Sequence, residues 1–480
     1  MSRRGLIALM LVGLLPACDA AVGSQRDAAS PPVNAAAAPR AAAASGVVTR
    51  TETAPANVDA TELAALDDDA EADDVEDAPA DVATAETGAK WTPEPGDDVQ
   101  PHQPLEFPEN LAKFYDALAA IDDGDPRVVR VLHYGASMIG VDDLTSILRE
   151  KFQTRFGDGG AGVVLLQRFM SNYLHRWVKL DARGWDNCYI GYLCKKDGTY
   201  GLGGVTYWSS NGRGYTKIAT RKETLGSTVS KFELWYATDP RGGDLLVRVD
   251  GGTPKRISTK AAAHEDRWET FDVDPGKHAI EVSAAPNGNV RAYGVALETD
   301  GPGITWEQFS WLGAFTKRMH GWDDAHIARQ VEHRDPSLVA FTFGGNDTRR
   351  VANGNVDGKG YAAEYVLGIN KVMAGAKNAS CIVIGMTDRG RSLTFEIKSA
   401  HVEEIVEAQR DAAKQAGCAF FDMYTAMGGA GSIKKWRAEN PPRATADLKH
   451  LTHHGRTFFG RWVYEAIVAG YVAHRTARPD

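Results

Sequence analysis

The sequence has few cysteines, and none of them stands at the spacing of a zinc site. There are five cysteines in 480 residues, and no cysteine or histidine cluster follows the pattern of a structural zinc site. We therefore expect no metal and no other cofactor, and we expect no nucleic-acid partner. Apolar runs are also short. The run from Leu6 to Leu15 is too short to span a bilayer as a mature helix.

The N-terminus has the pattern of a secretion signal. Arg3 and Arg4 precede the apolar run, which ends Leu15-Pro16-Ala17-Cys18. This ending resembles a bacterial lipoprotein signal, in which Cys18 is the lipidated residue. Ordinary cleavage near Ala20 is the alternative. We predict a signal peptide over 1–18 and an exported lipoprotein, anchored to a membrane in the periplasm or at the cell surface. Which membrane holds it stays open.

Residues 19–104 contain almost no aromatic side chains. They are rich in Ala, Pro, Asp, Glu and Thr, and such a segment cannot bury enough apolar surface to offset the entropy lost on ordering. We predict a disordered acidic linker. Between Asp59 and Asp98 there are 15 acidic residues and one lysine, so the chain outside this stretch is near +5 although its total is −9. This mild positive charge favours an anionic partner such as a cell-wall glycan.

The four remaining cysteines form two pairs by position. Cys188 and Cys194 lie close together in an aromatic, glycine-containing stretch, and they could close a small disulfide loop in an oxidising compartment. Cys381 and Cys418 each open an apolar run. They could be buried free thiols or a bridge between neighbouring strands.

From about residue 105 the chain alternates between two kinds of pattern. The segments 105–169 and 291–480 read as strands followed by helices, which indicates a five-stranded α/β domain. Between them, residues 170–290 contain short β-rich runs separated by turns, which indicates an inserted β-sandwich. We expect the α/β pattern to resume at Ala292–Leu297. The other expected α/β strands are Arg127–Tyr134, Leu338–Phe343, Cys381–Met386 and Cys418–Asp422.

Four short motifs lie where strands and helices meet, and together they supply the groups needed for acyl transfer. Ser137 follows a strand and precedes a helix, so it can be the nucleophile at the carboxyl edge of the sheet. Gly313 offers a backbone amide and Asn346 a side-chain amide for an oxyanion. Asp447 precedes His450 by three residues, which lets the carboxylate orient the imidazole as a base.

Each motif alone is weak. The serine could be a helix N-cap, Gly-Asn-Asp is typical of turns, and His453 and His454 compete with His450 for the role of base. The aromatic side chains Trp208, Trp311, Trp322 and Trp436 could stack on sugar faces, although we favour core positions for all four. The four motifs are far more specific as a set than any one alone, because of their order in the chain and their positions at separate strand ends.

The set resembles the SGNH hydrolase superfamily, also called GDSL esterases. In that family the four blocks carry Ser, Gly, Asn and His, with an Asp three residues before the His. The resemblance implies a flavodoxin-like three-layer α/β/α fold. It also implies a triad of Ser137, Asp447 and His450 and an oxyanion hole formed by the Ser137 amide, the Gly313 amide and Asn346. One residue departs from the pattern, because Ala136 stands where the family usually has an Asp.

A narrower resemblance is to the peptidoglycan O-acetylesterase branch, whose β-rich insertion is similar to a carbohydrate-binding module. It rests on Phe156–Gly162, the β-rich insertion itself, and Ala426–Ser432 with Trp436. We therefore expect a monomeric carbohydrate O-acetylesterase acting on an acetylated glycan. A carbohydrate O-acetyltransferase with the same site is the second interpretation. A tethered glycan-binding protein with a decayed site is the third. The identity of the glycan stays open.

Overall fold

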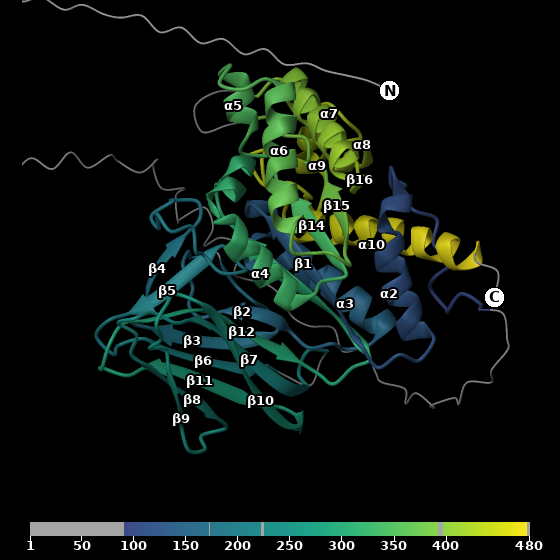
Figure 1. Ribbon diagram of the computed structural model, residues 1–480. Coiled ribbons are helices and arrows are strands. Elements are labelled where there is room, and N and C mark those ends of the chain that lie inside the picture. Colours follow the sequence, from purple (N-terminus) through teal and green to yellow (C-terminus); the bar gives the residue numbers. More distant parts are fainter. Residues whose placement is uncertain (1–90, 172, 222–224, 392–396, 478–480) are drawn as a thin grey trace, which may run out of the picture. The chain divides into compact units, whose positions relative to one another are not determined.

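The computed structural model describes residues 91–477, apart from 172, 222–224 and 392–396. Figure 1 shows the arrangement of helices and strands. The predicted signal peptide, Cys18 and most of the predicted linker lie outside the described residues. Within those that are described, none of the helices combines the length and the apolar character needed to cross a bilayer.

A parallel five-stranded sheet forms the centre of the α/β part. Its strands are fully or almost fully buried, as expected for a parallel sheet covered on both faces. The strand order places the first strand in the chain beside the second and the third, which is the 2-1-3-4-5 order of flavodoxin-like folds. In spatial order the strands are β13 (Gly303–Ser310), β1 (Val128–Gly135), β14 (Leu338–Thr342), β15 (Ser380–Ile384) and β16 (Ala419–Phe421).

Helices cover both faces of this sheet and give three layers. On one face a buried cluster joins alternate strand residues such as Val129 and Val131 to α2 (Ala112–Asp122), α3 (Asp143–Phe156) and α10 (His453–Thr476). On the other face, Leu132 and Tyr134 belong to the cluster that contains α4 (Asp324–Arg334), α6 (Gly358–Met373) and α7 (Ser399–Ala416). The shorter helices are α5 (Thr348–Ala352), α8 (Met423–Met427), α9 (Ser432–Ala438), η1 (Pro108–Leu111), η2 (Ser137–Asp142) and η3 (Thr316–Gly321).

Two antiparallel sheets lie between β1 and β13 in the chain, and they fit the expected β-sandwich. Side chains from both sheets belong to one buried cluster, which includes Phe232, Leu234, Val247 and Val282. The first sheet has the order β10 (Asp266–Gly276), β7 (Val229–Ala237), β12 (Val290–Glu298), β5 (Val205–Ser209) and β4 (Asp186–Tyr189), with β2 (Gly162–Leu165) also paired to β12. The second has the order β3 (Val178–Arg183), β6 (Tyr215–Thr220), β11 (Ala279–Ala284), β8 (Asp244–Val249) and β9 (Lys255–Ser258).

The fold class is therefore the predicted one, but one α/β strand was misplaced. Ala292–Leu297 lies in β12 of an antiparallel sheet and pairs with β7. The strand beside β1 is instead β13, Gly303–Ser310. The domain limits at 169/170 and 290/291 stay a prediction. Those limits assign β2 and most of β12 to the α/β domain, although the two strands pair with each other in the antiparallel sheet.

Residues 91–104 correct the predicted extent of the linker. We expected disorder up to residue 104, yet this stretch makes specific contacts with the α/β part. Aromatic rings and a buried carboxylate hold it in place, because each finds a partner on α3 or α10. The contacts are Trp91 edge-on to Tyr471 at 5.8 Å, Asp97 Oδ1 to Arg155 Nε at 2.8 Å, and His102 stacked on Trp462 at 4.0 Å.

Both pairs of cysteines are bonded in the structure. Cys188 is joined to Cys194, and Cys381 is joined to Cys418. The second disulfide links the start of β15 to the residue just before β16, which are neighbours in the sheet. Of the two possibilities for Cys381 and Cys418, buried free thiols or an inter-strand disulfide, the structure has the disulfide.

Candidate active site

The turn that carries Ser137 is fixed by hydrogen bonds to both neighbouring strands. The Ala136 amide donates to the Thr342 carbonyl at the end of β14 (3.1 Å), and the Trp311 amide just after β13 donates to the Gly135 carbonyl (2.8 Å). A side chain at Gly135 would place its Cβ 2.7 Å from the Thr342 oxygen, so only glycine allows this approach. Ser137 thus stands at the point where the strand order reverses, which is the usual ligand-binding edge of such sheets.

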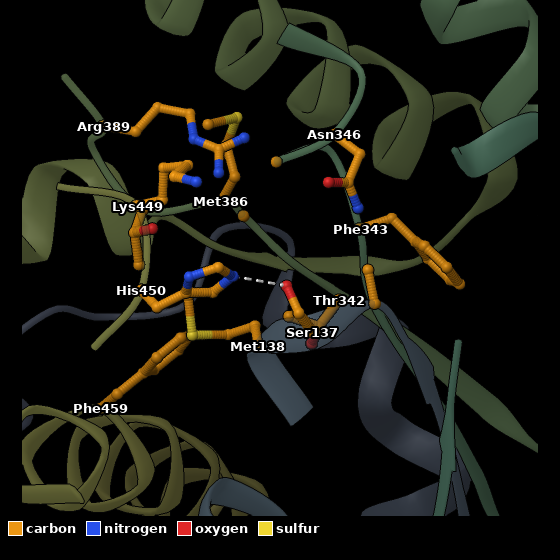
Figure 2. A pocket seen from close by; sticks show the side chains of 14 residues that line it. Ser137, Met138, Thr342, Phe343, Asn346, Met386, Arg389, Lys449, His450 and Phe459 are labelled. Atoms are coloured by element: carbon orange, nitrogen blue, oxygen red, sulfur yellow. Dashed lines mark hydrogen bonds between the residues drawn. The ribbon is translucent and has the colours of Figure 1, made fainter. Parts of the chain in front are cut away.

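His450 links Ser137 to Asp447. Its Nε2 lies 3.0 Å from Ser137 Oγ, and its Nδ1 lies 2.6 Å from Asp447 Oδ2. Figure 2 shows the first of these contacts as a dashed line at the centre of a cavity. Asp447 and His450 come from the segment just before α10. The N-cap residue of that helix, Thr452, accepts a hydrogen bond from the Gly455 amide. The helix start therefore fixes where the imidazole points.

The Asp447 carboxylate is held ionised by its surroundings. Partial burial works to raise its pKa, but hydrogen bonds from His450, Thr445 and the Lys449 amide and the charge of His450 outweigh it, and the pKa lies well below the usual range. The Lys449 and His450 amides both donate to Asp447 Oδ1, at 2.9 and 3.1 Å. An ionised Asp447 accepts a hydrogen bond from the N–H at His450 Nδ1, which leaves Nε2 free of a proton to accept a hydrogen bond from the serine hydroxyl.

Asn346 lies across the same cavity from His450. It follows β14 in the turn Gly344–Asp347, and its side-chain Nδ2 donates to the Ala314 carbonyl at 3.0 Å. The turn is braced from inside by buried Asp347, which accepts from the Thr316 amide and hydroxyl. The Asn346 amide has a second N–H that this contact does not use.

Gly313 is placed near this group but not in the cavity wall. It is exposed, has φ +70°, and precedes Ala314, the residue that accepts from Asn346. The residues that line the cavity include Ser137, Asn346 and His450 but not Gly313. The structure thus brings Ser137, His450 and Asn346 together in one cavity, with Asp447 hydrogen-bonded to His450. The role of Gly313 as an oxyanion donor stays a prediction.

The alternative histidines lie elsewhere. His453 Nδ1 is 3.5 Å from Asp143 Oδ1 and its side chain is 68% exposed, while His454 packs on the ring of Phe458. Neither lines the cavity. Of the tryptophans, Trp311, Trp322 and Trp436 are buried, which fits the core positions that we favoured, and Trp208 is only partly buried beneath the Lys195 ammonium.

Several residues of the cavity were not predicted. Met138 and Phe459 lie below the serine in Figure 2, and Phe343, Met386, Arg389 and Lys449 surround it. Met386 and Arg389 follow β15, so the carboxyl end of that predicted strand was the signal that could have drawn attention to them. Among residues 91–477, with their gaps, no set of three or more His, Cys, Asp or Glu side chains is arranged to hold a metal ion.

Comparison with known proteins adds a likeness in fold. No protein-family model matches the chain, and no curated protein matches it either. Among solved structures, a peptidoglycan O-acetylesterase superposes with a TM-score of 0.61 at 18% identity, over 77% of this chain and 97% of that one. The chain shares the fold of that protein. At this identity the likeness establishes the fold alone.

Two further structures superpose far less well. A lipase/acylhydrolase from Enterococcus faecalis shares 17% identity with a TM-score of 0.27, over 35% of this chain and 77% of its own. A family two carbohydrate esterase from Cellvibrio japonicus shares 12% with a TM-score of 0.21, over 60% and 99%. The roles of individual residues therefore rest on the geometry described above.

Proposed function

We propose that this chain is a serine esterase that removes O-acetyl groups from a carbohydrate. The observation that supports the proposal is the contact series Ser137 Oγ, His450 Nε2, His450 Nδ1 and Asp447 Oδ2, at 3.0 and 2.6 Å, in a cavity that Asn346 also lines. A hydroxyl, an imidazole and a carboxylate in this order are the arrangement needed to activate a serine.

The reaction follows from the placement of these groups. Ser137 Oγ attacks the acetyl carbonyl while His450 Nε2 takes the hydroxyl proton, and the ionised Asp447 stabilises the resulting imidazolium. Asn346 and the Ser137 amide stabilise the oxyanion, with Gly313 as the predicted third donor. His450 then gives its proton to the departing sugar oxygen, which leaves an acetyl-serine. Water, deprotonated by His450, attacks the acetyl-serine. The bond to Ser137 Oγ breaks, His450 returns the proton to that oxygen, and acetic acid leaves.

The cavity favours a short acyl group. Four large apolar side chains, Met138, Phe343, Met386 and Phe459, line it, and we infer that they restrict the space for a long acyl chain. A glycan as the alcohol moiety is supported by the fold likeness to a peptidoglycan O-acetylesterase and by the mild positive charge of the chain outside residues 59–98.

Substitution of Ser137 tests the proposal directly. We expect Ser137→Ala to reduce acetate release from acetylated glycans and from a chromogenic acetate ester by about 10³-fold or more, because the attacking oxygen is lost. The measurement is initial-rate acetate release across a panel of acetylated glycans, with thermal unfolding of both proteins as the control for folding. Unchanged turnover in the variant would rule out the mechanism. Acetyl transfer to added sugar in place of water would make the protein a transferase instead.

A further inference from the structure

Arg389 is a buried cation in the wall of the catalytic cavity. It follows β15, and its side chain, only 9% exposed, lines the cavity that Ser137 and His450 also line. One guanidinium nitrogen, Nη1, donates to the neutral Thr348 hydroxyl at 3.2 Å. The buried Nε has no hydrogen-bond partner, and within the described part of the chain no carboxylate forms an ion pair with this guanidinium.

The other buried arginines of the described chain are all paired with carboxylates. Arg149 meets Asp142, Arg334 meets Glu298 and Glu307, Arg350 meets Asp347 and Glu364, and Arg456 meets Asp143. A buried charge without a partner is unfavourable, because desolvation is not offset by an ion pair. Arg389 is therefore the exception that needs an explanation, and its position in the cavity wall suggests that its partner is a ligand.

The nearby Asp447 does not fill this role. Its two carboxylate oxygens already accept from His450 Nδ1 and from the Lys449 and His450 amides. Burial lowers the pKa of Arg389 to about 10, while the charge of Asp447 works in the opposite direction. The guanidinium is accordingly still positively charged at neutral pH, and it is available to a second anion.

The position of Arg389 identifies the part of the substrate that it would meet. In Figure 2 its guanidinium lies between Lys449, on the His450 side of the cavity, and Asn346. Its Nη1 donates to Thr348, just beyond the turn that carries Asn346. Because His450 must protonate the departing sugar oxygen, the alcohol moiety of the ester has to occupy the His450 side. Lys449, which also lines the cavity, adds a second positive charge there.

We propose that Arg389 is a specificity-determining residue that binds a carboxylate on the alcohol moiety of the ester, so that the preferred substrate is an acetylated acidic sugar. The planar guanidinium offers two parallel N–H groups that match a carboxylate. This inference rests on the proposed esterase function and adds the chemical class of the substrate.

The test compares two probes that differ only in charge. Mono-O-acetylated methyl glucuronide and its C6 amide are prepared with the same mixture of acetyl positions, so that several distances between ester and carboxylate are sampled. Initial acetate release at limiting concentration gives kcat/KM for each. We expect the native protein to prefer the acid by about 10- to 100-fold, the range for a charged hydrogen bond.

Variants at position 389 test whether Arg389 causes the preference for the acid probe over the amide probe. Arg389→Gln is expected to bring the ratio of acid to amide close to one, and Arg389→Lys to restore part of it, because the charge returns without the planar fork. Arg437→Gln, the same substitution at an exposed arginine of α9, is the matched control and should leave the ratio unchanged. A purely structural role for Arg389 would lower both rates together and keep the ratio, which would overturn the inference.

Failure of the inference is distinguishable from failure of the proposed function. If the native protein hydrolyses both probes equally and Ser137→Ala abolishes the release, the esterase stands and the role of Arg389 is wrong. If Ser137→Ala leaves acetate release unchanged, the esterase itself is wrong. A native ratio close to one overturns the inference even if the Arg389 variants fail to fold.

Discussion

His450 makes its two functional contacts from a single turn. Asp447 and His450 are three residues apart, and Asp447 Oδ1 accepts from the backbone amides of Lys449 and His450 while Oδ2 meets the imidazole. The same carboxylate therefore both shapes the turn and orients the base. A substitution at either residue should disturb the turn as well as the chemistry.

Alanine substitutions at His450 and His453 test which histidine acts as the base. We expect His450→Ala to lower kcat for a chromogenic acetate by about 10³-fold or more, because no other group can take the serine proton. His453→Ala should change kcat by no more than about twofold, since its side chain is largely exposed and outside the cavity. Steady-state kinetics on both variants make the comparison. Greater loss in His453→Ala than in His450→Ala would contradict the assignment.

At the residue scale the sequence predicts what depends on local spacing. Ser137, Asn346, Asp447 and His450 could be found because each follows a strand or sits in a short recognisable turn. Arg389 could not be found in this way, because what distinguishes it is the absence of a carboxylate partner. No local sequence pattern predicts which residues far apart in the chain form ion pairs.

Asp143 joins three elements behind the serine turn. It is the first residue of α3, it binds Arg456 of α10 at 2.6 Å, and it contacts Arg176 in the segment before β3. Burial works to raise its pKa, but His453, Arg456 and Arg176 lower it to about 2. One carboxylate thus adds an ionic contact between α3 and α10, which also pack together through apolar side chains.

This pairing predicts a pH-dependent part of the stability. Because the pKa of Asp143 is lowered on folding, its contribution is fully present above about pH 4 and is lost as the pH falls towards about 2. We expect the difference in unfolding free energy between the native protein and Asp143→Asn to narrow by about 2 kcal/mol between pH 6 and pH 2.5. Urea unfolding of both proteins across this range measures it. A difference that does not vary with pH would show that the ion pairs contribute nothing.

The misplaced strand shows what patterns cannot resolve at the element scale. β13 contains Thr305, Glu307 and Gln308, so its sequence does not look like that of a buried strand, yet all three residues are buried. Glu307 is tolerated there because Arg334 of α4 pairs with it. β12 is apolar like a parallel strand because it is buried along almost its whole length, although its sheet is antiparallel. In both cases tertiary burial overrides the local pattern.

At the scale of the whole molecule, residues 91–104 belong to the folded part of the described chain. Asp97 is buried against Arg155, and His102 both stacks on Trp462 and bonds the Ala426 carbonyl. The acidic, aromatic-poor composition of the stretch concealed this, since these few side chains are spread thinly among residues typical of a linker.

Truncation tests where the folded part begins. We expect a chain that starts at residue 91 to keep the unfolding free energy of the full protein. A chain that starts at residue 105 should lose about 2 kcal/mol or more, because a buried ion pair and two aromatic contacts disappear. Urea denaturation of the two truncated chains beside the full protein makes the comparison. Equal stability of the two truncated chains would show that 91–104 contribute nothing.

The pairing of β1 with β13 has a consequence for how the protein reaches its active state. Val128 and Gly303 are partners in the sheet although the entire antiparallel part lies between them in the chain. Joining strands across so long a loop is slow, because the loop entropy is lost before the contact forms. If the intervening strands fold first, they shorten the loop that remains to be closed. The serine turn, which depends on Trp311 bonding Gly135, cannot form before β1 and β13 have joined across the insertion.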